Sequence, residues 1–334
     1  MACSLKNSHV RTKMSNYNYC TIIDNPDFLP ATWAEKIDRA CRDGDKETVI
    51  NLLTSISNAQ RQQIRGPYKL KYGKELDEAL DKKFSGDLES AILALVDTPL
   101  EYDLKQLKKA MKGLGTDEAV LIEILCSRTP DQLRAIRAGY ERQYGKQLEK
   151  DVAGETSGEF RDLLVALVTG SKDPSHDTND VQAKDDAVRL FADGKGKFAG
   201  TKDQPSHFLK ILATQNQYQL RKVFAEFEKL SGATIEKAIE KEFSGDLKNG
   251  YLTIARASSN KQSFFATQLY NAMKGLGTRD NDLIRVIVTR SEVDLKVIKD
   301  EYQRLYNKTL EDHIKGDTSG AYRDCLLKIC QGNY

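Results

Sequence analysis

The chain has 334 residues, of which 40% are hydrophobic and 30% are charged, and its formal net charge is +2. These proportions are typical of a soluble globular protein, and a charge so near zero provides no strong field that would attract nucleic acid. The longest apolar runs, 91–96 and 163–168, have six residues each, whereas a membrane-spanning helix needs about 20. The chain can therefore meet a membrane only from outside.

Residues 1–23 form a tail that precedes any repeated pattern. The tail lacks the apolar core of a secretory signal, and none of the six cysteines belongs to a Cys-x-x-Cys pair or suggests a disulfide framework. We therefore expect reduced thiols in a cytoplasmic protein, with Cys126 and Cys325 in the core because they fall in apolar helical stretches. The tail, which holds Cys3 and Cys20, is a candidate binding site for a protein partner.

The rest of the chain is built from repeats. Met-Lys-Gly-Leu-Gly-Thr occurs at 111–116 and again at 273–278, an offset of 162 residues that also relates Tyr140 to Tyr302. Two weaker copies share the frame, because a shift of 72 residues toward the N-terminus leads from Tyr140 to Tyr68 and a shift of 87 residues toward the C-terminus leads to Phe227. Units of this kind must pack on each other, because none can bury its apolar face alone.

These offsets predict a tail, repeat 1, repeat 2, a linker rich in Asp, Ser and Pro, repeat 3 and repeat 4. Repeats 1 and 3 share Phe-Ser-Gly-Asp-Leu and repeats 2 and 4 share Thr-Ser-Gly, which indicates that a half of two repeats was duplicated. The predicted segments, in the same order, are residues 1–23, 24–98, 99–170, 171–182, 183–258 and 259–334.

Helical periodicity without strand-like alternation predicts an all-α fold with about five helices in each repeat. Two capping boxes mark helix starts, Ser57 with Gln60 in repeat 1 and Thr129 with Gln132 in repeat 2.

Three further positions bear on helix boundaries. Helical spacing resumes after Thr116 and after Thr278, which predicts these threonines as N-caps. The Gly66-Pro67 dipeptide falls inside a predicted helix, which it should kink or shorten.

A loop and a distant acid recur together in repeats 2 and 4. Thr116 ends the first Gly-x-Gly-Thr loop and Glu155 follows 39 residues later, while Thr278 and Asp317 have the same separation. Glycines let a tight loop turn its carbonyls inward, and Ca²⁺ takes six to eight oxygen ligands in irregular geometry. The pattern therefore predicts a calcium site in each of these repeats.

The predicted ligands in repeat 2 are the carbonyls of Met111, Gly113 and Gly115 and the carboxylate of Glu155. They leave room for about two further oxygens. A calcium ion with a single carboxylate ligand keeps net positive charge, which would attract a lipid phosphate.

Other interpretations of the glycine loops find less support. A phosphate-binding loop needs Gly-Lys-Ser or Gly-Lys-Thr after a strand, and an EF-hand needs an Asp-x-Asp-x-Asp-Gly loop that ends in Glu; the sequence has neither. A plain turn between helices remains open, although two copies with matched acids argue against it. The four histidines are scattered, and no nucleophile with a paired base is visible, so we expect no enzyme.

With these loops and acids, the chain from Asp24 to the C-terminus resembles the annexin family. The resemblance implies a slightly curved all-α disc with calcium loops on its convex face. It also implies calcium-dependent binding to acidic phospholipid membranes, so that the protein is peripheral on membranes when calcium rises; export by a non-classical route is a further option. In repeat 4 the family's ligands correspond to Met273, Gly275, Gly277 and Asp317.

Repeat 1 departs from the family pattern. Its stretch at 41–45 is two residues short and lacks Gly-x-Gly-Thr, and Lys83 stands where the acid is expected. Because a cation there would repel calcium, the prediction is that repeat 1 has no calcium site.

Repeat 3 is altered rather than lost. Its glycine-rich loop ends at Thr201, and Glu242 follows 41 residues later, because two residues are inserted after the loop. The resemblance implies ligation there by the carbonyls of Lys197 or Phe198 and of Gly200, together with Glu242.

Three loop cations, Lys112, Lys274 and Arg279, could touch lipid phosphates, although solvated loop cations are an equally good interpretation. The alternative function is a helical scaffold that binds protein partners through the tail or the concave face of the disc.

Overall fold

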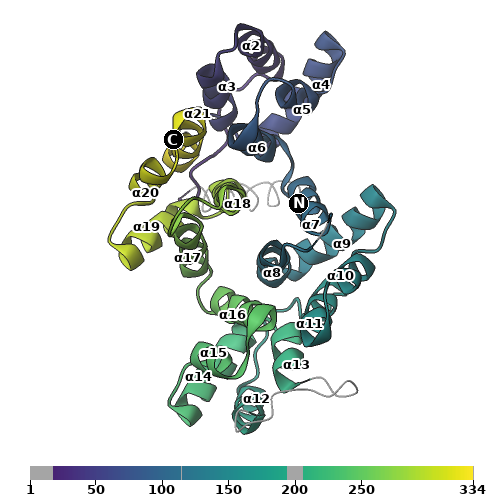
Figure 1. Ribbon diagram of the computed structural model, residues 1–334, viewed down its shortest axis with the longest axis vertical. Coiled ribbons are helices and arrows are strands. Elements are labelled where there is room, and N and C mark those ends of the chain that lie inside the picture. Colours follow the sequence, from purple (N-terminus) through teal and green to yellow (C-terminus); the bar gives the residue numbers. More distant parts are fainter. Residues whose placement is uncertain (1–17, 114, 194–205, 334) are drawn as a thin grey trace, which may run out of the picture. The chain divides into compact units, whose positions relative to one another are not determined.

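A computed structural model describes residues 18–113, 115–193 and 206–333. In these ranges it contains twenty α-helices and no strand, so the all-α prediction with about five helices in each repeat is confirmed (Figure 1). Of the helices in this part of the chain, none is long and apolar enough to cross a membrane.

The first two repeats contribute ten of these helices. In order they are α2 (Pro30–Asp43), α3 (Lys46–Thr54), α4 (Asn58–Tyr72), α5 (Leu76–Asp81), α6 (Gly86–Val96), α7 (Pro99–Ala110), α8 (Glu118–Ser127), α9 (Pro130–Tyr144), α10 (Leu148–Glu155) and α11 (Gly158–Val168).

The third and fourth repeats contribute the other ten, and the first of them starts at Asp180, inside the segment predicted as a linker. They are α12 (Asp180–Asp193), α13 (His207–Thr214), α14 (Gln217–Ser231), α15 (Ile235–Glu242), α16 (Gly245–Ser259), α17 (Lys261–Met273), α18 (Asp280–Ser291), α19 (Leu295–Tyr306), α20 (Leu310–Asp317) and α21 (Gly320–Gln331).

The third helix of each repeat, α4, α9, α14 or α19, has a clear stop signal. Both predicted capping boxes are also present, at the start of α4 and of α9. All four of these helices end at a residue in the left-handed conformation, which is the usual way to terminate a helix: Gly73, Gly145, Gly232 and Asn307.

The same third helices carry the aromatic position on which the repeat alignment depends. Tyr68, Tyr140, Phe227 and Tyr302 are all buried. A buried hydroxyl is costly unless it is hydrogen-bonded, and those of Tyr68 and Tyr140 donate to carboxylates of their own repeats. The repeated positions therefore form the core, as the periodicity predicts.

Gly66-Pro67 does not shorten its helix. Helix α4 runs from Asn58 to Tyr72 and holds Pro67 inside it, so of the two predicted outcomes shortening is wrong and a kink stays a prediction. The residue before a proline is disfavoured in helix because the proline ring clashes with its amide and with its Cβ. Gly66 has no Cβ, and this removes one of the two clashes.

The cysteines behave as the sequence predicts. Within the described residues five cysteines have free, buried thiols, and Cys126 and Cys325 belong to the core. Cys3 lies outside those residues.

The helices group into two compact units. Unit 1 combines the chain up to Pro99 with the chain from Phe265 onward, and unit 2 is Leu100–Phe264. In unit 1, α18 and α21 pack against α6, whereas in unit 2, α16 packs against α8 and α11. Packing therefore pairs repeat 1 with repeat 4 and repeat 2 with repeat 3. The shared sequence motifs follow a different pairing, because they relate repeat 1 to repeat 3 and repeat 2 to repeat 4.

Hydrogen bonds tie the two ends of the chain together inside unit 1. The amide of Thr21 donates to the carbonyl of Ser291 over 2.8 Å, and the amide of Asn333 donates to the carbonyl of Thr21 over 3.2 Å. The buried guanidinium of Arg61 is 3.2 Å from the carboxylate of Glu292, which adds an ion pair between repeats 1 and 4.

Candidate metal centres

The loop of repeat 2 joins α7 to α8. Gly113 and Gly115 have φ values of +108° and +88°, which L-residues with side chains rarely adopt. The amide of Asp117 donates to the carbonyl of Ala110 over 2.9 Å and closes the base of the loop. The carboxylate of Asp117 then accepts the amide of Val120 and caps α8.

The loop of repeat 4, between α17 and α18, shares these features. Gly275 and Gly277 have φ values of +109° and +82°, and the amide of Arg279 donates to the carbonyl of Ala272 over 2.8 Å. In the residues that the structure describes, two loops far apart in the sequence thus share their glycine conformations and their closing hydrogen bond.

The sequence predicts that the loop threonines are N-caps, and this prediction is wrong. That position belongs to Asp117 in α8 and to Arg279 in α18. The hydroxyl of Thr116 donates instead to Glu155, 3.0 Å from the carboxylate Oε2 and 3.3 Å from the carbonyl oxygen. This role was missed, although the constant spacing of 39 residues between threonine and acid was a signal for it.

Repeat 4 repeats this contact. The hydroxyl of Thr278 lies 3.2 Å from both the carboxylate Oδ2 and the carbonyl oxygen of Asp317. In each repeat the structure therefore brings the predicted acid to the end of the predicted glycine loop.

Burial divides each loop into an anchored base and an exposed tip. Met111 and Met273 are buried, so their side chains hold the loop to the core. Gly113, Gly115, Gly275 and Gly277 are exposed, as is Glu155, whereas Asp317 is half-buried. Leu276 at the tip of the repeat 4 loop has a fully exposed side chain.

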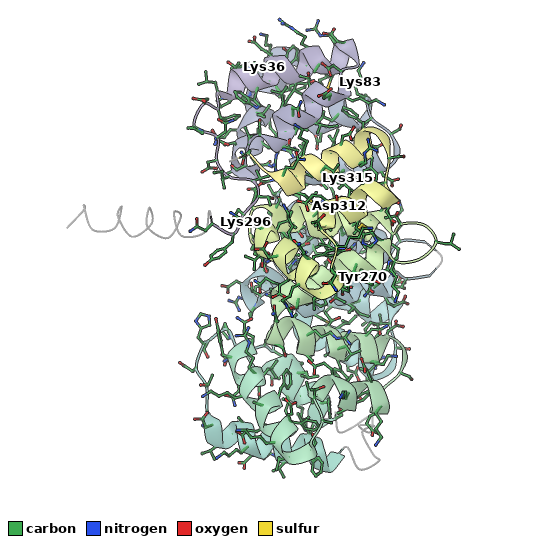
Figure 2. The ribbon with its side chains drawn as sticks, turned by 90° about the vertical axis from the view of Figure 1, so that its left-hand side faces the viewer. Lys36, Lys83, Tyr270, Lys296, Asp312 and Lys315 are labelled. Atoms are coloured by element: carbon green, nitrogen blue, oxygen red, sulfur yellow. The ribbon has the colours of Figure 1, made fainter. Side chains whose placement is uncertain are left out.

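The three cations predicted to touch lipid differ in their surroundings. Lys112 and Lys274 are exposed. The ammonium of Lys274 is 5.8 Å from the ring centroid of Tyr270, which Figure 2 labels. The guanidinium of Arg279 is 2.9 Å from the carboxylate of Asp282 on α18, which holds it toward that helix.

A cavity of about 380 Å³ adjoins the repeat 4 site within unit 1. It is lined by Asp87, Asp280, Asp317 and Tyr322, among others. Burial raises the pKa of Asp280, and the negative charges of Asp87 and Asp317 raise it further, while Tyr322 acts in the opposite direction. The acid of the candidate site therefore stands close to a second carboxyl group that ionises less readily.

Repeat 3 can be described only in part. Glu242 is the last residue of α15, and its carboxylate is 3.6 Å from the ammonium of Lys241. The predicted loop ligands Lys197, Phe198 and Gly200 lie outside the described residues.

Repeat 1 lacks the features that repeats 2 and 4 share. Its α2–α3 connection has one left-handed glycine, Gly44, and the carboxylate of Asp45 is engaged in capping α3. Lys83, exposed between α5 and α6, occupies the position of the acid (Figure 2).

The residues in repeats 2 and 4 suit calcium better than a transition metal. In the described part of the chain, no group of three or more His, Cys, Asp or Glu side chains could hold a metal ion. A structural zinc site needs several side chains of that kind, whereas calcium accepts backbone carbonyls together with a single acid. Left-handed glycines and a carboxylate held by a threonine provide such a set.

Comparisons with known proteins agree with this geometry. The model of the Annexin family matches four stretches of the chain, residues 33–95, 102–167, 196–254 and 264–329. Annexin A13 of Mus musculus is 44% identical over 298 residues, which cover 89% of this chain and 93% of that protein. Annexin A11 of Homo sapiens is 43% identical over 315 residues, which cover 94% of this chain but 62% of that longer protein.

Solved structures give the same result. The structure of annexin III has a TM-score of 0.89 and 41% identity, and the match covers 94% of this chain and 98% of that one. A calcium-bound annexin (Sm)1 has a TM-score of 0.81 and 29% identity, with 94% and 93% covered.

Proposed function

The chain belongs to the annexin family and so binds phospholipid membranes in a calcium-dependent manner; we propose that the glycine loops of repeats 2 and 4 hold the calcium ions. One observation carries this proposal. Both loops combine two left-handed glycines with a threonine hydroxyl that donates to the distant acid.

The proposed ligands are three loop carbonyls and one carboxylate in each repeat. They are Met111, Gly113, Gly115 and Glu155 in repeat 2, and Met273, Gly275, Gly277 and Asp317 in repeat 4. Calcium bound there would supply the positive charge that attracts the phosphate of an acidic lipid. Thr116 and Thr278 fix the carboxylates in advance, so less conformational entropy is lost on binding.

The loop tips provide the remaining contacts with the membrane. Lys112 and Lys274 are exposed beside the ligand carbonyls and can attract anionic headgroups, each by about 1 kcal/mol. Leu276 is fully exposed, and transfer of a leucine side chain out of water is favourable by about 1.5–3 kcal/mol. Arg279 contributes less in this proposal, because it is paired with Asp282.

The other two repeats differ in the proposal. Repeat 3 adds a site through Glu242 and the loop carbonyls of Lys197 or Phe198 and of Gly200, whereas Lys83 leaves repeat 1 without one. The repeat boundaries predicted from the sequence are also part of the proposal. So is a binding site for a protein partner in the tail. Annexins are in general non-enzymatic, and we extend this to the chain.

Sedimentation with phosphatidylserine vesicles, with calcium and then with chelator, tests the mechanism. Glu155→Gln and Asp317→Asn each remove one charged ligand, so each should raise the calcium concentration needed for half-maximal binding, by about tenfold for its own site. By linkage, vesicles should tighten calcium binding by the factor by which calcium tightens vesicle binding.

Two matched controls accompany these variants. Glu141→Gln removes an exposed acid of α9, and Lys83→Met alters the repeat that is proposed to lack calcium; neither should change vesicle binding. The double variant Glu155→Gln/Asp317→Asn would keep only the site proposed for repeat 3, so it should need more calcium than either single variant. An unchanged calcium requirement in the double variant would refute the assignment of ligands.

A further inference from the structure

Unit 2 contains a cavity of about 210 Å³ that the calcium mechanism does not use. It lies where α8 ends and α9 begins, next to the segment that follows α11 and to the start of α14. Its lining includes Arg128, Lys172, Asp173, Gln217 and Tyr218.

Lys172 is the unmatched charge of this cavity. The residue is half-buried, and its ammonium makes no hydrogen bond or ion pair with any other residue that the structure describes. Burial lowers its pKa. The nearby Cys126 thiol cannot serve as a counter-ion, because burial raises the pKa of that thiol to about 12.

Two of the other charges that line the cavity already have partners. The guanidinium of Arg128 makes two hydrogen bonds of 2.8 Å with Asp103. The carboxylate of Asp173 accepts the amide of Ser175 and the side-chain amide of Asn216, each over 2.8 Å.

The remaining ionisable groups lie nearer the rim. Asp131 is paired with Arg134, and the ring of His176 lies edge-on against Tyr218. Lys261, the first residue of α17, also belongs to the lining. Lys172 is therefore the cation of the lining that a bound anion would neutralise.

Two helix N-termini also point their partial positive charge at this cavity. Thr129 and Asn216, the N-caps of α9 and α14, both line it. Among the described residues, the amide of Gln217 has no hydrogen-bond acceptor, as expected for the first turn of a helix. Amides and dipoles of this kind favour phosphate groups.

We propose that this cavity binds a small soluble anion that carries a phosphate group, held by the Lys172 ammonium and by the free amide of Gln217 at the start of α14. The cavity and the glycine loop of repeat 2 lie at opposite ends of α8, a helix of ten residues and so about 15 Å long. A membrane held by the glycine loop would be too distant to supply the phosphate, which argues for a soluble ligand over a lipid headgroup.

Calorimetric titration of the full chain with inorganic phosphate, in chelator to avoid calcium phosphate, tests the proposal. Lys172→Met should weaken phosphate binding about tenfold, as expected for the loss of one charge-assisted hydrogen bond. Lys146→Met is the matched control, because Lys146 is exposed beyond the other end of α9. Phosphate also stabilises proteins in general by exclusion from their surface, and this effect should be equal in all three proteins.

A second measurement uses the unaltered chain and does not depend on how a variant folds. Acylation of lysines, mapped by peptide mass, should be slowed by phosphate at Lys172 and not at Lys146. Equal phosphate affinities of wild type and Lys172→Met, or labelling of Lys172 that ignores phosphate, would overturn the proposal.

Vesicles distinguish the two sources of phosphate. Lys172→Met should retain calcium-dependent sedimentation with phosphatidylserine vesicles. Protection of Lys172 by these vesicles, in place of phosphate, would contradict the assignment to a soluble ligand.

Discussion

For single residues, the φ values near +108° at Gly113 and Gly275 set the direction of the loop carbonyls. A residue with a Cβ is strained in such a conformation by about 1–3 kcal/mol. It can relax only if the loop changes shape, and this would turn the proposed ligand carbonyls away from one another.

Gly113→Ala should therefore weaken calcium-dependent vesicle binding and lower the free energy of unfolding by about 1–2 kcal/mol. Gly154→Ala is the control, because Gly154 lies in α10 with ordinary φ and nothing within 4 Å of an added Cβ. The control should bind vesicles normally and gain about 0.5–1 kcal/mol of stability. Sedimentation at a series of calcium concentrations and urea unfolding measure both effects, and equal effects of the two substitutions would contradict the argument.

Thr116→Val keeps the shape of the side chain and removes the hydroxyl that holds Glu155. The net value of such a hydrogen bond is about 1 kcal/mol, so half-maximal vesicle binding should need about fivefold more calcium for this site. Thr169→Val provides the comparison, because the Thr169 hydroxyl bonds only to carbonyls of its own helix. A normal calcium dependence in Thr116→Val would show that the hydroxyl does not position the acid.

The sequence predicted the glycines and acids of the candidate sites but not the role of the threonines. An N-cap and a hydrogen bond to a distant acid need the same residue type, and the choice between them depends on where α10 ends relative to the loop. Rules that consider only neighbouring residues contain no information about how closely the end of α10 approaches the loop. They succeed for Ser57 with Gln60, because every atom of a capping box lies within one turn.

Among the secondary-structure elements, α4 shows how one residue can cancel a local rule. Proline usually interrupts a helix, yet α4 continues through Pro67. The absence of a Cβ at Gly66 contributes to this, because that atom would meet the proline ring.

Gly66→Ala should accordingly lower the free energy of unfolding, by about 1 kcal/mol. Gly154→Ala, the same substitution in α10, should raise it. Urea unfolding of the two variants and the wild type is the measurement. If both variants were more stable than the wild type, the preceding glycine would not be the reason that α4 tolerates its proline.

At the scale of the whole molecule, the repeat pattern predicted the order of the copies but not which copies pack together. Similar periodicity in all four repeats leaves that choice open. It depends partly on residues that break the pattern. Arg61 stands where the other repeats have the buried residues Leu133, Leu220 and Leu295, and its guanidinium meets Glu292 of repeat 4.

This ion pair predicts a dependence of stability on pH. Burial raises the pKa of Glu292 above its ordinary value of 4.5, and the charge of Arg61 opposes this without cancelling it. The folded protein then holds this proton more tightly than the unfolded chain does, so stability falls as pH rises from 4.5 through the raised pKa.

Glu292→Gln removes that proton equilibrium. The stability of the wild type relative to this variant should therefore decrease as pH increases above 4.5. Urea unfolding across the acid range measures the difference, with Glu47→Gln, an exposed position on α3, as the control. Parallel pH profiles for wild type and Glu292→Gln would mean that Glu292 ionises as freely in the folded state as in the unfolded chain.

The composition of unit 1 also bears on how the chain is made. During translation, Leu100–Phe264 leaves the ribosome as one continuous stretch and can complete unit 2 at once. Residues before Pro99 emerge first, yet they finish folding last, because their packing partners begin at Phe265. A nascent chain halted before Glu292 would contain a folded unit 2. Its repeat 1 would not be packed, because Arg61 would lack the carboxylate of Glu292.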